Sequence, residues 1–331
     1  MTIHQNLTEY AGLPVATFGP NEEVPDDELL DDEVTDGEPA DGELPAGALT
    51  SPASYAWAVR TQFDEEPFED VWARFREQVD TSGITALIIG YWGASYGDGA
   101  ADVGTLLAEA APAFPALRSL FVGDVVMEEA EISWIEHGDI TPVLDAFPEL
   151  ERFEVRGSQG LVLNPFEHSG LRTLRFESGG LPAEVVRAVG ASDLPNLEHL
   201  DLWLGTPNYG GDATTDDLAP LLSGERFPAL RRLGLENSEI EDQVAAAVAG
   251  AAVVAQLETL SLGMGILTDT GAESLLAGQP LTHLKKLDLE HHFLSDSMIE
   301  RVRAALPGVE VLLDGQMTPH GGDWFFIEIS E

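Results

Sequence analysis

The strongest constraint on the fold is a short apolar pattern that recurs along most of the chain. Each copy has an apolar residue, two variable residues, a second apolar residue, one variable residue and a third apolar residue. Eight clear copies occur: ITALII from Ile84, LRSLFV from Leu117, LERFEV from Leu150, LRTLRF from Leu171, LEHLDL from Leu197, LRRLGL from Leu230, LETLSL from Leu257 and LKKLDL from Leu284. A weaker ninth copy, VEVLLD, begins at Val309, and successive copies start 33, 33, 21, 26, 33, 27, 27 and 25 residues apart. Periods of this length are typical of solenoids, whose stacked repeats share one core.

Each period is predicted to contain one strand and, in most cases, one helix. The alternation at the end of each copy predicts a short strand with one buried side. Helices are expected over 102–111, 182–189, 215–222, 241–252, 269–276 and 296–305. The predicted fold class is therefore an α/β solenoid, or horseshoe, with a parallel sheet on the concave side and helices on the convex side.

Two of the repeats resemble a known family. The stretches LSLGMGILTDTGAESLL and LDLEHHFLSDSMIERV are similar to leucine-rich repeats of the ribonuclease-inhibitor type. The resemblance covers residues 84 to about 313 and implies a leucine-rich-repeat horseshoe. Ser238, Gly265 and His292 stand where this family usually has the asparagine of its turn. The resemblance specifies a fold and implies no particular activity.

Three segments are expected along the chain. Residues 1–50 form an acidic, largely disordered tail, because half of residues 21–44 are acidic and their charges repel one another. Residues 51–83 form a capping strand and helix at the N-terminal end of the repeats. Residues 84–331 form the solenoid of about nine repeats together with a closing C-terminal segment.

Two terminal stretches are apolar enough to pack on the solenoid. Residues 7–18 contain several apolar side chains and are expected to dock back on the fold. Residues 322–330, GDWFFIEIS, are expected to add a strand that protects the open edge of the sheet.

The charge of the chain limits its partners. It contains 59 Asp and Glu against 16 Lys and Arg, which gives a formal net charge of −43. Such a charge repels phosphates and anionic lipids, so neither nucleic acid nor a membrane is expected as a partner. Simple solubility and a basic protein partner both explain the acidity. The chain has no cysteine and no predicted signal peptide or membrane span, so a cytoplasmic location is expected.

The variable positions of the predicted strands form three rows on the concave face. The first row is Ala86, Ser119, Arg152, Thr173, His199, Arg232, Thr259, Lys286 and Val311. The second row is Ile88, Phe121, Glu154, Arg175, Asp201, Gly234, Ser261, Asp288 and Leu313. The third row is Gly90, Gly123, Arg156, Glu177, Trp203, Glu236, Gly263, Glu290 and Gly315.

Opposite charges in these rows fall on neighbouring strands. Parallel strands lie about 4.8 Å apart, so contacts are expected between Arg175 and both Glu154 and Asp201, and between Arg156 and Glu177. Such ladders either stabilise the sheet or form a patterned docking surface. On the second interpretation, the predicted protein-binding residues are Phe121, Arg152, Arg156, Arg175, Glu177, His199, Asp201, Trp203, Arg232, Glu236, Lys286, Asp288 and Glu290.

Enzyme and cofactor motifs are weak in this chain. Residues 93–97, GASYG, match the nucleophile elbow G-x-S-x-G around Ser95, but the repeat period places them in the bend of the first repeat. Asp102 stands at the third glycine position of the dinucleotide fingerprint. His291 beside Glu290 is a weak ligand candidate, whereas His292 is expected to make structural hydrogen bonds in its turn. No catalytic residue, cofactor or metal is therefore predicted.

The predicted function is a non-enzymatic protein-interaction scaffold that binds a protein through its concave face and rim loops. One alternative is an acidic inhibitor or immunity-like protein for a basic enzyme, whose encounter the negative field would accelerate. A distant alternative is a serine hydrolase that uses Ser95.

Overall fold

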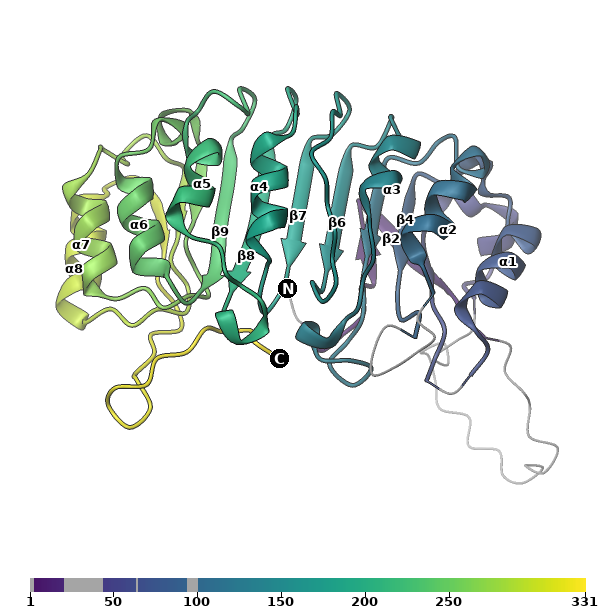
Figure 1. Cartoon of the computed structure of the whole chain (residues 1–331), viewed down its shortest axis with the longest axis horizontal. Coiled ribbons are helices and arrows are strands. Elements are labelled where there is room, and N and C mark those ends of the chain that lie inside the picture. Colours follow the sequence, from purple (N-terminus) through teal and green to yellow (C-terminus); the bar gives the residue numbers. More distant parts are fainter. Residues whose placement is uncertain (1–2, 21–43, 64, 94–100) are drawn as a thin grey trace.

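A single sheet runs through the protein from end to end (Figure 1). The computed structural model describes residues 3–20, 44–63, 65–93 and 101–331. The sheet has 12 strands in sequence order. They are β1 Glu9–Tyr10, β2 Leu13–Phe18, β3 Ala56–Val59, β4 Ala86–Ile89, β5 Ser119–Val122, β6 Arg152–Arg156, β7 Thr173–Glu177, β8 His199–Gly205, β9 Arg232–Ser238, β10 Thr259–Ser261, β11 Lys286–Asp288 and β12 Glu310–Leu312. The β1–β2 pair is antiparallel, and β2 to β12 are parallel to their neighbours.

The helices lie together on one face of this sheet (Figure 1). They are α1 Phe68–Gln78, α2 Val103–Ala110, α3 Thr141–Ala146, α4 Ala183–Ala191, α5 Thr215–Leu222, α6 Glu241–Ala249, α7 Asp269–Ala277 and α8 Asp296–Ala305. Short 3₁₀ turns occur at Ala48–Thr50, Pro52–Ser54, Thr81–Gly83, Ala111–Ala113, Ile132–Trp134, Pro207–Tyr209 and Ala252–Gln256. All six helices expected from the repeat period are present, which confirms the predicted α/β solenoid. The short α3 was not predicted.

Side-chain caps fix where several of these helices begin. Before α5, Thr214 and Asp217 form a capping box, in which each side chain accepts from the other residue's backbone N–H. Before α8, the Ser295 side chain accepts from Met298 N. The caps satisfy amide groups that the first turn of a helix leaves without partners.

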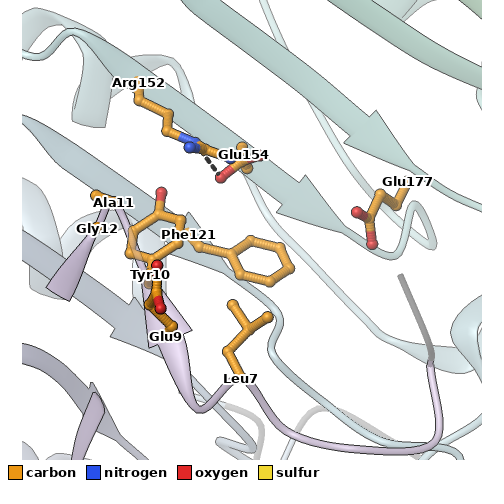
Figure 2. A pocket seen from close by; sticks show the side chains of 9 residues that line it. All are labelled: Leu7, Glu9, Tyr10, Ala11, Gly12, Phe121, Arg152, Glu154 and Glu177. Atoms are coloured by element: carbon orange, nitrogen blue, oxygen red, sulfur yellow. Dashed lines mark hydrogen bonds and ion pairs between the residues drawn. The ribbon is translucent and has the colours of Figure 1, made fainter. Parts of the chain in front are cut away.

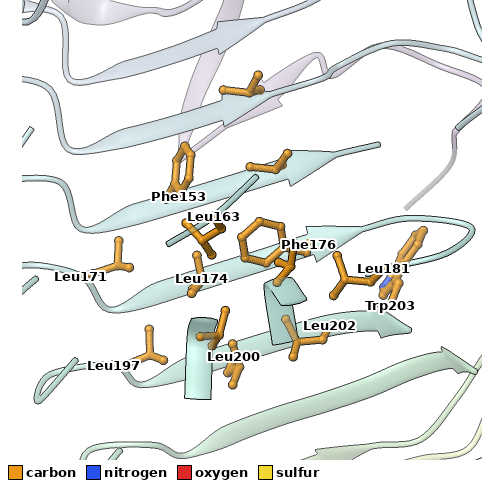
Figure 3. Close-up of a cluster of buried hydrophobic side chains, with 14 of the residues drawn as sticks. Phe153, Leu163, Leu171, Leu174, Phe176, Leu181, Leu197, Leu200, Leu202 and Trp203 are labelled. Atoms are coloured by element: carbon orange, nitrogen blue, oxygen red, sulfur yellow. The ribbon is translucent and has the colours of Figure 1, made fainter. Parts of the chain in front are cut away.

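The apolar positions of the repeats form one continuous core between sheet and helices. Figure 3 shows Leu171, Leu174 and Phe176 of one repeat beside Leu197 and Leu200 of the next. These five side chains are at most 1% exposed. Because each repeat shares its core with its neighbours, the repeats stabilise one another and cannot be assigned separate cores.

The strand register confirms the first two rows for eight copies of the pattern, confirms the third row at Arg156–Glu177 and Trp203–Glu236, and corrects the ninth copy. Lys286 pairs with Glu310 and Leu287 pairs with Val311, so Val311 lies at a core position. Glu310 takes the first-row position that the sequence pattern assigned to Val311. A slip of one residue moves every side chain of a strand to the other face, so Leu313 and Gly315 are likewise displaced from the predicted rows.

The two ends of the chain differ from expectation in structure. Residues 13–18 form β2, which pairs with β3 and so belongs to the sheet. The closing strand expected over 322–330 is wrong, because the sheet ends at β12 and the following chain turns back beneath the strand ends (Figure 1). The predicted boundary at residue 50 stays a prediction, and residues 21–43 lie outside the described part of the chain.

Candidate functional site

The concave face, opposite the helices, is covered over its N-terminal half. The covered side chains are Ala56, Ala58, Ala86, Ile88 and Phe121, and all are at most 3% exposed. Leu7 and Tyr10 pack on this apolar floor. The Tyr10 and Phe121 rings lie 6.2 Å apart between centroids. Ala11 and Gly12, both with positive φ, form the turn that lets β1 fold back from β2.

A pocket of about 290 Å³ lies where this cover ends. Figure 2 shows Leu7, Tyr10 and Phe121 on one side of it, with Arg152, Glu154 and Glu177 beyond. Arg152 binds Glu154 through two bonds, Nε–Oε2 at 2.7 Å and Nη2–Oε1 at 3.0 Å. The same guanidinium lies over the Tyr10 ring at 5.2 Å. Arg152 and Glu154, two of the charged residues lining the pocket, are therefore already paired with each other.

Strands β6 to β8 carry a buried network of ion pairs at the centre of the concave face. Glu177 binds Arg156 at 2.7 Å and Arg175 at 3.1 Å, and Arg175 also binds Asp201 at 2.9 Å. Burial alone would raise the pKa of Glu177, but Arg175 and Arg156 together hold that pKa below its ordinary value. The predicted Arg156–Glu177 and Arg175–Asp201 contacts are confirmed. Glu154 pairs with Arg152 instead of with Arg175.

Two carboxyl groups meet above a glycine beside this network. A Cβ atom at Gly234 would lie 2.5 Å from Asp201 Oδ1 and 3.4 Å from Glu236 Cδ, so only glycine leaves them room. Trp203 Nε1 donates to Glu236 Oε2 at 3.0 Å. Burial, followed by the neighbouring charge of Glu236, raises the pKa of Asp201 well above its ordinary value.

Solvent reaches the first row on β6 to β11, and it also reaches the half-buried Glu236, Asp288 and Glu290 of the other two rows. On these strands the first row consists, in register, of Arg152, Thr173, His199, Arg232, Thr259 and Lys286. Arg232 is exposed and the other five are half-buried. Burial, followed by the charges of Arg175, Arg232 and Arg152, lowers the pKa of His199 to about 4. These six positions contain no acid, although the chain has a net charge of −43.

The predicted binding residues separate into three groups by exposure. Those that are buried are Phe121, Arg156, Glu177, Asp201 and Trp203. Arg175 is mostly covered, with 13% of its side chain exposed. Those that solvent reaches are Arg152, His199, Arg232, Glu236, Lys286, Asp288 and Glu290. Trp203 is only 3% exposed, so it supports the surface and does not present an anchor.

Sequence reasoning missed two groups that shape the site. The expected docking of residues 7–18 is confirmed by β2 and by the Tyr10–Phe121 contact, but the position of Tyr10 over the concave face was not predicted. Asn237 was passed over because it stands one position before the expected turn residue. It is fully buried, with φ of 53°, and its amide binds the main chain of Ile329.

The two adjacent histidines have structural partners. His292 Nε2 lies 3.2 Å from Leu313 O, and its Nδ1 accepts from Leu294 N at 3.1 Å. The expected hydrogen-bonding role of His292 in its turn is therefore confirmed. His291 Nε2 lies 3.1 Å from Phe326 O. Among the described residues, no cluster of three or more His, Cys, Asp or Glu is arranged to hold a metal ion.

Two further sequence features are resolved only in part. Ser95 of the G-x-S-x-G motif lies outside the described residues. Within the described ranges, no helix has both the length and the apolar character needed to cross a membrane.

Comparison with known proteins identifies a structural relative. Nineteen chains of solved structures match, among them a crystal structure of a protein from Bacteroides fragilis. The two sequences are 32% identical, the match covers 79% of this chain and 73% of that chain, and the TM-score is 0.73. The two chains belong to one family. No family model and no curated protein matches the chain. The likeness establishes kinship and fold, and it brings no activity or partner with it.

Proposed function

We propose that the chain is a leucine-rich-repeat protein of the ribonuclease-inhibitor type that serves as a cytoplasmic, non-enzymatic interaction scaffold. The repeated sheet with its helices supports the repeat assignment. The scaffold would bind a protein partner through the part of the concave face that its own chain leaves open.

The observation that carries this proposal is the open first row. Arg152, His199, Arg232 and Lys286 lie in one register across six strands, with threonines between them. A row without acids on so acidic a protein is a local site for carboxylate groups of a partner. Second-row acids hold two of the cations of this row in place, Glu154 on Arg152 at 2.7 Å and Asp288 on Lys286 at 2.9 Å, which lowers the entropy cost of ordering them on binding.

The test compares two charge reversals of similar size. Arg232→Glu together with Lys286→Glu places two acids in the open row, whereas Arg187→Glu together with Arg301→Glu changes two exposed helix residues. Affinity capture from the native organism should lose its protein partner with the first variant and keep it with the second. Equal capture by both variants, with melting temperatures unchanged, would remove the concave face from the proposal.

A second candidate is an acidic inhibitor or immunity-like protein for a basic enzyme. The net charge of −43 supports it, because such a field accelerates encounter with a basic partner. In this case the association rate should fall about tenfold or more between 0.05 and 0.5 M salt, while dissociation changes little. A salt-independent association rate would reject this candidate and leave the scaffold proposal standing.

A further inference from the structure

The last residues of the chain are bound along the C-terminal ends of the strands. Glu328 N donates to Met264 O at 2.8 Å, and His291 Nε2 lies 3.1 Å from Phe326 O. Asn237 Oδ1 accepts from Ile329 N at 3.0 Å, and Asn237 Nδ2 donates to Ile329 O at 2.5 Å. We call Asn237, Met264 and His291 the rim site, and residues 324–331 the C-terminal segment. Figure 1 shows this segment in yellow, returning below the strands toward the middle of the molecule.

The three rim-site residues share an uncommon backbone conformation. They recur 27 residues apart at the same position in consecutive repeats. Their φ angles are 53°, 66° and 53°, in the left-handed region that side chains disfavour. In the described part of the chain only one other non-glycine residue, Ala11, has a positive φ. Such strained residues cluster at ligand clamps, and each of these three bonds the main chain of the C-terminal segment.

The rim site recognises an extended backbone more than particular side chains. The two bonds of Asn237 to Ile329 imitate the pair that a neighbouring strand would make, as in strand-addition binding. Of the C-terminal segment only Ile327 is buried, at 6% exposed, whereas Trp324 is 62% exposed. Ile329 also packs on the core, and Phe293 contacts Phe325 and Phe326. A terminal segment with so few fully buried side chains belongs to the less stable parts of a fold.

Charge is unfavourable at one position of the bound segment. The charge of Glu328 acts repulsively on Glu290, whose other charged neighbours are Asp288, Asp314 and the opposing Lys286. The pKa of Glu290 is raised, chiefly by burial and then by Asp288, with Asp314 and Glu328 adding to the effect. A lysine or arginine in place of Glu328 would turn this repulsion into attraction.

We propose that the rim site is a binding site for an extended segment of a basic protein partner, and that the C-terminal segment occupies it until such a segment displaces it. The partner segment would place an aliphatic side chain where Ile327 lies and a basic side chain where Glu328 lies. The rim site shares no residue with the open first row, so this proposal stands or falls separately from the scaffold proposal.

The test measures the binding of two labelled peptides to the full-length chain. One peptide copies residues 324–331, and the other carries lysine in place of Glu328. Ile327→Asp removes the buried anchor and should free the rim site, and the milder Ile327→Ala serves if the first variant fails to fold. The freed chain should bind the lysine peptide about tenfold more tightly than the parent does, because its own segment no longer competes.

Two controls connect that binding to the rim site. Adding Asn237→Ala to the freed chain should weaken binding about tenfold, since it removes both bonds to the peptide backbone. Adding Arg232→Glu should leave binding unchanged. The lysine peptide should outbind the unchanged peptide about threefold or more at low salt, and 0.5 M salt should remove that advantage.

Several results would overturn the proposal. They are equal peptide binding by the parent and the freed chain, binding that is unchanged by Asn237→Ala, or tighter binding of the peptide that copies residues 324–331 than of the lysine peptide. Sedimentation that shows the parent chain to be a dimer, and Ile327→Asp to be a monomer, would also overturn it, because a second copy would then be the occupant.

Discussion

The concave face has two halves that are built from the same repeat but differ in what covers them. In β3 to β5 its rows carry alanine, isoleucine and phenylalanine, and the chain's own Leu7 and Tyr10 cover them. In β9 to β11 the rows carry charged residues, hydroxyl residues and glycine, and the C-terminal segment covers only the strand ends. The leucine positions, which face the helices, are alike in both halves. The row positions alone therefore decide whether a stretch of this solenoid closes on itself or stays open.

The buried ion pairs of β6 to β8 lie between these two halves. On the N-terminal side these ion pairs are buried, so water cannot take the place of a charged partner that a substitution removes. Farther along the same rows, solvent reaches the charged groups. Substitutions at equivalent row positions should therefore have very different effects in the two halves.

The largest difference is expected in the third row, between Glu177 and Glu290. Glu177→Ala leaves Arg156 and Arg175 in the interior without their shared acid and should cost about 3–5 kcal/mol of unfolding free energy. Glu290→Ala removes a half-exposed acid from an acidic environment and should change stability by less than about 0.5 kcal/mol. Urea unfolding of both variants measures the difference. Similar losses would contradict the division into halves.

The division could be predicted only in part from the sequence. The spacing of the leucines predicts the eight repeat strands and their register, because period-two alternation is a local property. Which rows are buried depends on Tyr10, which reaches Phe121 across more than a hundred residues of chain. No pattern within the repeats records that contact. The apolar row residues Ile88 and Phe121 and the apolar stretch 7–18 indicate that a contact is possible, but they do not specify it.

The ends of the solenoid were the hardest part to predict. In the ninth copy, VEVLLD has apolar residues at adjacent positions, so the pattern fits two registers equally well. For residues 322–330 the alternation of FFIEIS favoured a strand. In the structure, Asn237 and Met264 bind the backbone of these residues instead. Their position recurs in the repeats, but the residue type differs from copy to copy, so the sequence did not predict their left-handed conformation.

The second-row pair Phe121 and Ser261 provides the next test. Phe121→Ala should cost about 3 kcal/mol, at the low end for a buried phenylalanine, because Leu7 and Tyr10 can settle into the space. Ser261 is also buried, but its Oγ has no hydrogen-bond partner among the described residues, so Ser261→Ala should stay within about 0.5 kcal/mol of the parent. Thermal melts at one pH suffice to compare them. A loss of more than 2 kcal/mol for Ser261→Ala would show that the open half is as tightly packed as the covered one.

A pH effect on stability is expected from Glu241, a buried acid at the start of α6. Burial, followed by the charge of Glu236, raises the pKa of Glu241 well above its ordinary value of 4.5. The folded protein then holds this proton more tightly than the unfolded chain does. Its contribution to stability is complete below pH 4.5 and is lost as pH rises through the folded pKa.

Glu241→Gln should remove that loss. Between pH 4 and pH 8, the unfolding free energy of the variant should rise relative to that of the parent by about 1 kcal/mol or more, since one pKa unit corresponds to about 1.4 kcal/mol. Glu239→Gln, at an exposed neighbour, is the matched control and should follow the parent. Parallel curves for the parent and Glu241→Gln would show that Glu241 is solvated in solution.

The smallest effect is expected on the rim where the strands begin. Arg172 and Glu198 form an ion pair at 2.5 Å, but their side chains are 54% and 52% exposed. Glu198→Ala should cost less than about 0.5 kcal/mol, and 0.5 M salt should abolish even that difference. Its bond is shorter than the one between Arg156 and Glu177, so a ranking by distance would predict the opposite order. If unfolding experiments place Glu177→Ala far above Glu198→Ala, the cover over the pair determines its contribution to stability, and the bond length does not.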